Sequence, residues 1–353
     1  MENATAMRPS HHYKRLLITI ALGLAVIAPV TTARAQDMLE LKLATADVDY
    51  NPTTDSVLKL AARLGIYEKH GVKVEIVPLE GSPQVVAALN SGAVDLGDIS
   101  IESAIRLRAE NDIPIKGIVA GTLGAPFLIA TKTEITAVDQ LVGKSFAISD
   151  TGGLDHTLTQ MVLKSSGVAA DGPSYVPVGA PAARVQALAA GKVDATTASY
   201  GTFLAVADTP GIHILVQPED FSAATPGLSK FVAALDTTIT NKHEALQRFV
   251  DALVETSRLY AANPDQWVSA MAEVRDDLPK PTLEKTAAYL TDRWCVYGCL
   301  NAHELEKTVA FVYSNAEFKD IKAIPSEDLV DRQFIAKAIE TLGPVAGETV
   351  DQP

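Results

Sequence analysis

The chain is poor in cysteine and tryptophan, and its histidines are scattered. It has two cysteines, two tryptophans and seven histidines in 353 residues. A structural zinc site takes about four ligands of the Cys, His, Asp or Glu type, and no histidine pair stands at suitable spacing near the cysteines. The sequence therefore gives no support to a metal site, and we predict no metal and no cofactor.

Basic residues are also in short supply. The chain has 30 Lys and Arg against 43 Asp and Glu, a formal net charge of −13. Removing the leader described below takes away four basic residues and one acidic residue, which leaves 26 against 42, or −16. Such a surface favours solubility and repels polyanions. We therefore expect no nucleic-acid partner and no binding to anionic membranes.

One apolar run stands out, and it lies at the N-terminus. Arg8, Lys14 and Arg15 precede the apolar stretch 16–30, and Ala33-Arg34-Ala35 supplies a small-x-small cleavage pattern. These are the parts of a secretory signal peptide. A membrane anchor would need about 20 apolar residues. We predict a signal peptide over residues 1–35 and export to the periplasm.

The cysteines stand four residues apart in WCVYGC. In an oxidising compartment, Cys295 and Cys299 are expected to form one small disulfide, with Gly298 bending the chain between them. The mature chain of 318 residues is too long for one compact core and suits two domains.

A 16-residue pattern occurs twice. Residues 85–100 read VVAALNSGAVDLGDIS and residues 184–199 read RVQALAAGKVDATTAS, with seven identities at a constant offset of 99. Each copy has apolar residues at helical spacing, a glycine that ends the helix, and a short strand that closes on a serine. Two helix-to-strand units can also converge on such a pattern by chance. Our interpretation is two similar α/β lobes, with strands ending at Ser100 and Ser199.

The remaining pattern alternates strands and helices. Strands are predicted at 39–46, 72–77, 115–119, 127–130, 145–148, 175–178 and 213–216, with helices between them. Two irregular segments, 121–126 and 221–227, are candidate crossings between lobes. The chain beyond residue 242 reads as amphipathic helices, which we expect to pack on the first lobe. The fold class is therefore α/β.

Several segments together resemble the periplasmic solute-binding proteins of the nitrate, sulfonate, taurine and thiamine-precursor ABC transporters. The resemblance runs in order through LAARLGIYEKHGVKVEIV, QVVAALNSGAVDLGDIS, AVDQLVGKSFAIS, RVQALAAGKVDA, YAANPDQW and IPSEDLVDRQFIAKAIETLG. It implies a type II periplasmic binding protein, with lobe 1 formed by residues 38–124 and 226–353 and lobe 2 by residues 125–225. It also implies a monomer that delivers a small solute to a membrane permease and its ATPase. The implied role is transport, with no catalysis; a sensory protein that hands its ligand to a receptor is an alternative that the sequence leaves open.

Ligands of open α/β sheets lie beyond the carboxyl ends of strands, and the family's pockets are lined by such loops and by helix starts. Carried over position by position, the resemblance implies these ligand-binding candidates: Asp47, Asp49, Tyr50, Asn51, Ser82, Ile99, Ser100, Thr122, Gly124, Thr151, Gly152, Gly153, His156, Gly179, Ser199, Tyr200 and Thr225.

The loop Thr151-Gly152-Gly153 is the best candidate for an anion cradle, because amides at a helix start can bind an anionic group. It lacks the Gly-Lys-Ser/Thr ending of a phosphate loop. An ordinary loop with a residue that caps the helix would have the same sequence pattern. Asp155 lies in the first turn of the following helix, where its charge would repel an anion. His156 could donate to a ligand, but a lone histidine on a helix is more often a surface or packing residue. Ser100 and Ser199 lie in no Gly-x-Ser-x-Gly elbow, which disfavours catalysis.

The candidate loops carry several aspartates and no Lys or Arg. Arg106, Arg184 and Lys230 are near in sequence, where a solvated helix face is the simpler interpretation. A strongly charged dianion therefore fits poorly. A monoanion such as a sulfonate or carboxylate, or a planar solute such as a pyrimidine or thiamine precursor, fits better. An enzyme that resembles the pyrimidine synthase of thiamine biosynthesis is a further alternative, although the two cysteines are expected to lie far from any cleft loop.

Overall fold

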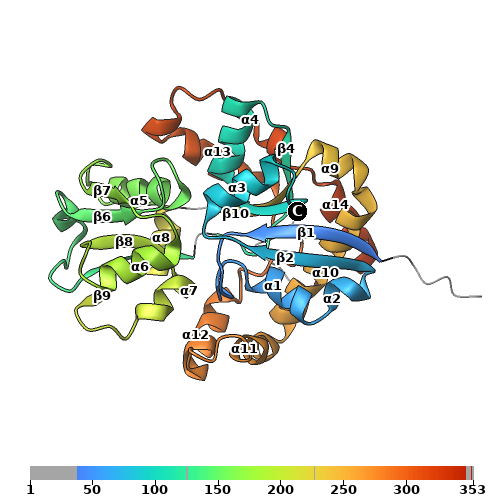
Figure 1. Cartoon of the computed structure of the whole chain (residues 1–353), viewed down its shortest axis with the longest axis horizontal. Helices are drawn as coiled ribbons and strands as arrows, with labels where there is room; N and C mark the ends of the chain where they lie inside the picture. The colour runs from blue at the N-terminus through green and yellow to red at the C-terminus, as the bar shows by residue number, and fades with distance from the viewer. Residues whose placement is uncertain (1–37, 125, 226, 347–350, 352–353) are drawn as a thin grey trace, which may run out of the picture. The chain divides into compact units, whose positions relative to one another are not determined.

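The computed structural model describes residues 38–124, 126–225, 227–346 and 351. The predicted signal peptide over residues 1–35 lies outside these residues. Two five-stranded mixed sheets, each flanked by helices, form two lobes (Figure 1). This confirms the predicted α/β class and the mixed sheet in each lobe. Within the described residues, no helix has both the length and the apolar character to cross a membrane.

The first sheet has the strand order β2-β1-β3-β10-β4. Its strands are β1 (Leu39–Thr45), β2 (Val72–Pro78), β3 (Leu96–Ser100), β4 (Ile115–Val119) and β10 (Lys230–Leu235). Its helices in the N-terminal part of the chain are α1 (Ser56–Arg63), α2 (Ile66–Lys69), α3 (Ser82–Asn90) and α4 (Ile101–Asn111). The large apolar core of this lobe runs from Leu41 to Leu123 and resumes at Leu228.

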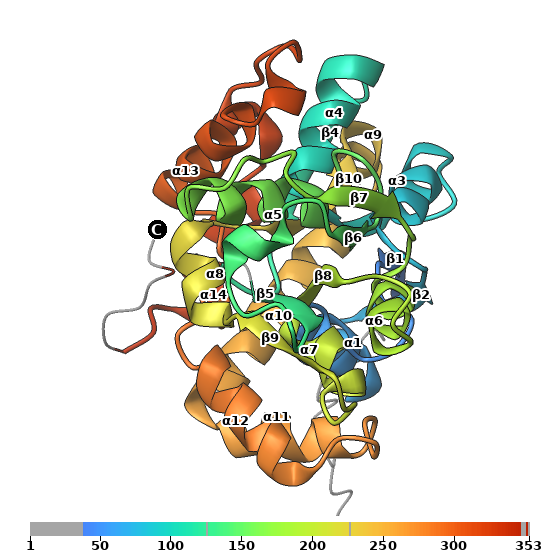
Figure 2. The same ribbon diagram turned by 90° about the vertical axis from the view of Figure 1, so that its left-hand side faces the viewer.

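The second sheet has the order β7-β6-β8-β5-β9. Its strands are β5 (Phe127–Lys132), β6 (Ser145–Ile148), β7 (Ser174–Pro177), β8 (Ala195–Ser199) and β9 (Ile212–Val216). The helices are α5 (Leu154–Ser165), α6 (Pro181–Ala189), α7 (Tyr200–Phe203) and α8 (Pro218–Ala224), with short 3-10 turns η1 (Val138–Leu141) and η2 (Leu204–Val206). Figure 2 turns this lobe toward the viewer.

The sequence repeat occupies equivalent places in the two sheets. Its copies are α3 with β3 and α6 with β8, and each of these strands is the central one of its sheet. Gly92 and Gly191 end the two helices with φ of 71° and 69°, a left-handed conformation that glycine adopts without steric cost. The two strands end at Ser100 and Ser199, as predicted, and each serine caps the next helix.

The strand that follows each crossing runs against its neighbours. Strand β5 is antiparallel to β8 and β9, and β10 is antiparallel to β3 and β4. The other pairings are parallel. The first crossing joins β4 to β5, as predicted. The second was predicted to begin at Phe221, but helix α8 continues to Ala224 with Phe221 fully buried, so the irregular segment is shorter.

The C-terminal part is helical, as predicted, and it packs on the first lobe. It comprises α9 (Asp236–Asn241), α10 (His243–Ala262), α11 (Pro264–Ala272), α12 (Lys280–Leu290), α13 (Ala302–Tyr313), η3 (Ala316–Phe318), η4 (Ser326–Leu329) and α14 (Gln333–Leu342). Strand β10, which precedes this region, has no recognisable pattern in the sequence. Its residues are apolar and fully buried on both faces at 231–234, so they show no alternation.

Cys295 and Cys299 form a disulfide with an S–S distance of 2.09 Å. The bridge lies beside the first crossing, because the Ala120 N–H donates to the Gly298 carbonyl at 2.9 Å. Leu123 makes a similar bond to Arg293 at 3.0 Å. The bridge thus lies beside the first crossing, and neither cysteine lines a cavity between the lobes. Pairing between segments so far apart along the chain leaves no local signal in the sequence.

Candidate functional site

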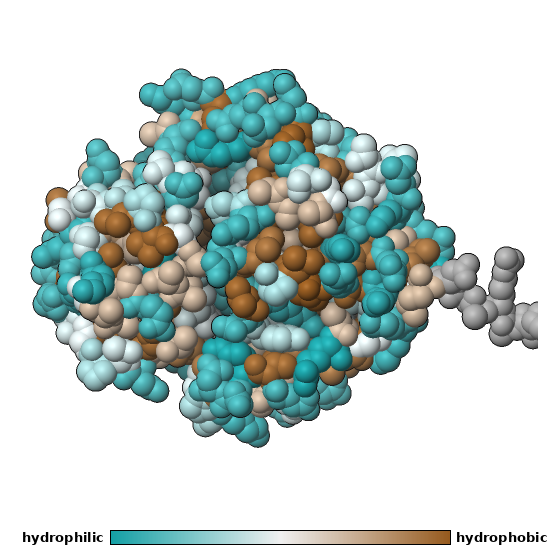
Figure 3. Space-filling model, in the orientation of Figure 1, coloured by the Kyte–Doolittle hydropathy of each residue, from teal (hydrophilic) through white to brown (hydrophobic). Residues whose placement is uncertain are grey.

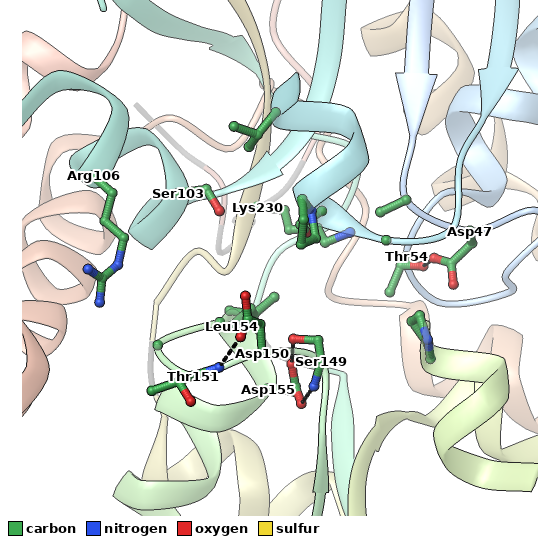
Figure 4. Close-up of a pocket in the computed structure, with 18 of the residues that line it drawn as sticks. Asp47, Thr54, Ser103, Arg106, Ser149, Asp150, Thr151, Leu154, Asp155 and Lys230 are labelled. Atoms are coloured by element: carbon green, nitrogen blue, oxygen red, sulfur yellow. Dashed lines mark hydrogen bonds between the residues drawn. The ribbon is translucent and has the colours of Figure 1, made fainter. Parts of the chain in front are cut away.

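A cavity of about 300 Å³ lies between the two lobes and is lined by residues of both. Figure 3 shows the groove between the lobes on the molecular surface. In the close-up, Asp47, Thr54 and Lys230 belong to one wall, and Ser149, Asp150, Thr151 and Asp155 belong to the other (Figure 4). Strand ends and helix starts thus face each other across the cavity, as expected for ligand sites of open α/β sheets.

The first wall is organised by the loop between β1 and α1. Asp47 accepts a hydrogen bond from Thr54 Oγ1 at 3.0 Å. The buried Lys59 ammonium donates to the Asp47 carbonyl at 2.7 Å and pairs with Asp55, also at 2.7 Å. Burial raises the pKa of Asp55 to about 7 even though Lys59 opposes the shift. Lys59 therefore fixes the loop backbone, and the Asp47 carboxylate is left facing the cavity.

Three helices begin at the cavity without a side-chain cap. They are α3, whose first residues Ser82 and Pro83 line the cavity, α5 after Gly153, and α6 beginning at Pro181. Helix starts carry unpaired backbone N–H groups and a partial positive charge. The wall therefore offers hydrogen-bond donors suited to an anionic or polar group. Helix α4 differs, because Ser100 caps its start.

A buried ion pair lies behind the start of α5. Asp155 accepts a hydrogen bond from the Ser149 N–H at 2.8 Å and another from Ser149 Oγ. Arg184 Nε stands 3.6 Å from Asp155 Oδ2, and both side chains are almost completely buried. Arg184 also donates to the Gly179 carbonyl at 2.6 Å. The charge of Asp155, which was expected to repel an anion, is thus matched by Arg184.

Two more cations line the cavity. Lys230 Nζ lies 3.2 Å from Asp98 Oδ2. Burial acts to lower the pKa of Lys230, but the carboxylates of Asp98 and Asp47 outweigh it and raise that pKa, so the residue stays charged. Arg106 pairs with Glu110 at 3.4 Å and stacks over the Phe318 ring. The simpler interpretation of these residues as a solvated helix face is wrong, since Arg106, Arg184 and Lys230 all line the cavity.

Ten of the candidate residues line a cavity between the lobes. Six line the main one: Asp47, Ser82, Thr151, Gly152, Gly153 and Ser199. Asp47 also lines a second cavity of about 260 Å³, together with Asp49, Tyr50 and Asn51. The two cavities share Ala46, Asp47, Pro181 and Thr202. Thr225 lines a third and very small cavity beside Glu102.

Ile99 and Ser100, which line none of these cavities, and Thr225 have structural contacts. Ile99 is fully buried in the core of the first lobe. Ser100 is also fully buried, and its Oγ accepts the Ser103 N–H at 3.2 Å. A bulky replacement there would disturb the fold, so Ser100 is unsuited to a test of binding. Thr225 Oγ1 donates to the Phe221 carbonyl at 2.8 Å.

Further candidates lie near the cleft without lining the two larger cavities. Thr122 donates to the Thr53 carbonyl at 3.3 Å, and the Gly124 carbonyl accepts from Ser229 Oγ at 2.7 Å. The Gly179 carbonyl accepts from Arg184. The ring of Tyr200 lies 6.5 Å from that of Tyr289.

His156 is a buried structural residue in this arrangement. Its Nδ1 accepts the Gly152 N–H at 2.9 Å and lies 3.1 Å from Glu317 Oε1. Burial lowers the pKa of His156, although nearby carboxylates oppose the shift. The ring thus holds the Gly152 loop from behind.

Sequence reasoning missed several residues of the wall. Thr54, Ser103, Ser149 and Thr202 line the cavity and have polar side chains. Ser149 follows the last residue of β6, so the strand-end rule could have found it. Ser103 and Thr202 stand within the first turns of α4 and α7, and no local pattern distinguishes them from other helix residues.

The comparisons with known proteins agree with this architecture. The profile of the NMT1/THI5 like family matches residues 56–267. A protein of Brucella abortus (strain 2308), named as a binding protein, is 24% identical over 261 residues, which are 74% of this chain and 78% of that protein.

Two solved structures share the fold. One is the ligand-binding component of an ABC-type import system from Staphylococcus aureus with zinc bound, with a TM-score of 0.69, 16% identity, and coverage of 85% of this chain and 99% of that one. The other is the alkanesulfonate-binding protein from Xanthomonas axonopodis pv. citri bound to MOPS, with a TM-score of 0.65, 21% identity, and coverage of 86% and 99%. The family match spans more than half of the chain, which therefore belongs to the NMT1/THI5-like family.

Proposed function

We propose that this protein is the solute-binding component of an ABC importer and holds a small organic solute in the cavity between its lobes. The observation that carries the proposal is a cavity of about 300 Å³ lined from both lobes by strand ends and uncapped helix starts. A two-lobed protein can close around a ligand by hinge motion. Export through the N-terminal leader and delivery to a membrane permease with its ATPase are parts of the same proposal.

The ligand class favoured by the wall is a small monoanion such as a sulfonate or a carboxylate. The first turns of helices α3, α5 and α6 supply backbone N–H donors, and the Lys230 ammonium supplies a charged donor. A dianion is disfavoured, because Lys230, Arg106 and Arg184 each already pair with a carboxylate. The named ligand of the alkanesulfonate-binding relative supports the same class.

A planar and weakly basic solute, such as a pyrimidine, is the second candidate. Asp47 and Asp150 line the cavity, and among the described residues neither forms an ion pair. The ring of Phe127, which also lines the cavity, could stack on such a solute.

Binding without chemical change is the role that the site supports. Ser199, which lines the cavity, accepts the Thr202 N–H at 3.1 Å and caps α7. The cavity lining, within the part of the chain that the structure describes, contains no histidine or cysteine. A pyrimidine-synthase-like activity is therefore the less supported alternative. Incubation with pyridoxal phosphate and iron should give no turnover.

The test is a thermal-shift screen of the mature protein with alkanesulfonates, small carboxylates, aromatic acids and pyrimidines, followed by calorimetry. A ligand that binds the folded state raises the melting midpoint in a concentration-dependent way. The variant Lys230→Met should weaken the binding of an anionic ligand by tenfold or more and leave the binding of a neutral pyrimidine nearly unchanged. Lys192→Met, an exposed lysine of the second lobe, is the matched control.

The outcome separates the two candidates. Binding of a pyrimidine that is insensitive to Lys230→Met favours the planar solute. If no compound shifts the midpoint and native mass spectrometry finds no copurified small molecule, the binding proposal fails.

A further inference from the structure

Asn51 joins the two lobes through its side-chain amide. It lies in the loop between β1 and α1 and is buried, with 4% of its surface exposed. Its Nδ2 donates to Ser199 Oγ and to Thr202 Oγ1 of the second lobe, both at 3.0 Å. Its Oδ1 accepts from the Thr53 N–H at 3.1 Å and from Thr53 Oγ1 at 3.2 Å.

These four bonds use the whole hydrogen-bonding capacity of the amide. A carboxamide has two N–H donors and two acceptor lone pairs, and here the donors reach the second lobe while the acceptor is held inside the first. The side-chain amide of Asn51 therefore has no free polar atom to offer a ligand, although the residue lines the second cavity. This differs from the ligand-contact role that the sequence analysis expected for it.

Gly201 completes the contact from the opposite side. Its N–H donates to Thr53 Oγ1 at 3.2 Å, and α7 lies beside the loop before α1 in both views of the ribbon (Figures 1 and 2). A Cβ atom on Gly201 would collide with Asn51 Oδ1 and would stand 2.8 Å from Pro52 Cδ. The backbone of the second lobe therefore approaches the first more closely than any residue with a side chain would allow.

Gly201 is not required by its own backbone. It is absent from the glycines with positive φ, and it lies within helix α7, where alanine is the better helix former. The atoms that an added Cβ would meet belong to Asn51 and Pro52, which are both residues of the other lobe. The absence of a side chain thus serves only the contact between lobes.

We propose that Asn51 and Gly201 form a closure contact that holds the two lobes together over the cavity and sets the open–closed balance, with Asn51 acting as a positioning residue. The contact contains only neutral groups, so it works at any pH at which the protein is folded. At the opposite edge of the cleft, Asn315 donates to Gln160 at 2.7 Å, which is also a neutral contact, but there Glu317 faces His156 and adds titratable groups.

The proposal predicts how a single methyl group should act. Gly201→Ala inserts a wedge between the lobes while leaving each lobe's own packing in place. The open form should therefore gain population without a fall in the melting midpoint. A ligand that binds only the closed form has an apparent dissociation constant inversely proportional to the closed fraction, so a closed fraction of about one tenth would weaken binding roughly tenfold.

The experiment needs no ligand. Nitroxide labels at Lys73→Cys and Lys192→Cys, one exposed position in each lobe, report the distance between lobes by double electron–electron resonance. The wild-type background should give a population at the short distance of the closed structure, and Gly201→Ala should move it to longer distances. Ser174→Ala, at an exposed position of β7 in the second lobe and away from both crossings, is the control.

Thr202→Val is the second variant, for the case in which Gly201→Ala does not fold. It keeps the side-chain shape but removes one acceptor of Asn51, and it should lengthen the distance to a smaller extent. The proposal is overturned if Gly201→Ala gives the wild-type distances, if Ser174→Ala opens the lobes equally, or if the wild-type protein shows no closed population. Only the expected effect on ligand affinity rests on the proposed importer role. The ligand screen can therefore fail while the distance measurements support the closure contact. Equally, the distance measurements can fail while a ligand binds.

Discussion

Glu102 offers a test of how burial beneath the cleft controls stability. It lies in the first turn of α4, is 3% exposed, and has an Oε2 atom without a hydrogen-bond partner. Burial raises its pKa from 4.5 to about 7, because desolvation outweighs the hydrogen bonds from its own backbone and Ser100 and the charge of Arg106. The carboxyl group is therefore protonated in the folded protein at mildly acidic pH.

The sign of the pH dependence follows from this shift. Well below pH 4.5 the group is protonated in both the folded and unfolded states, so it contributes no penalty. As the pH rises toward 7, the unfolded state ionises first, and the folded state loses stability. A shift from 4.5 to about 7 corresponds to a loss of about 3 kcal/mol above pH 7, since one pKa unit is about 1.4 kcal/mol.

The variant Glu102→Gln removes the ionisation while keeping nearly the same shape. Its free energy of unfolding, measured with urea, should exceed that of the wild type by up to about 3 kcal/mol at about pH 8 and should be close to it at about pH 4. Asp55 and Asp351 are also buried acids with raised pKa values. Their contributions to the pH dependence of stability cancel when the variant is compared with the wild type at each pH. Glu306→Gln, on an exposed part of α13, is the control. An equal difference at both pH values would refute the reasoning.

Two further predictions concern other parts of the fold. Replacing Cys295 and Cys299 together by serine should lower the free energy of unfolding by about 2 kcal/mol, since the bridge closes a loop of only a few residues; an unchanged urea midpoint would contradict this. Asp194 has its pKa lowered from 3.8 to about 2, chiefly by the hydrogen bond from Lys132 at 2.6 Å. Its contribution is present above pH 3.8 and disappears as the pH falls through about 2. Asp194→Asn should therefore destabilise the protein by about 1–2 kcal/mol at about pH 7, allowing for solvent screening, and should converge with the wild type in acid unfolding.

Several site residues could be predicted because they follow local rules. Ser82, Gly152 and Ser199 stand at helix starts or strand ends, and each lines the cavity. The same rules also selected Ser100 and Ile99, which are buried away from it. A strand end has one residue that faces the cleft and a neighbour that faces the core, and the sequence pattern does not distinguish between them at a strand buried on both faces.

The charged residues of the cleft show the limit of local reasoning. Lys230 belongs to β10, which pairs with β3 although a whole lobe separates the two strands along the chain. Its pairing with Asp98 depends on that antiparallel register. Arg184 reaches Asp155 from a different helix. None of these pairs has a regular spacing that could be recognised along the chain.

The sequence by itself determined the elements and the duplicated plan, because helix caps, glycine stops and apolar periodicity act over a few neighbouring residues. Only the tertiary structure decided which side chains share the cavity, which carboxylates are matched by cations, and how the lobes meet at Asn51 and Gly201. These depend on contacts between residues that are distant along the chain, whose energies come from burial and distance in three dimensions.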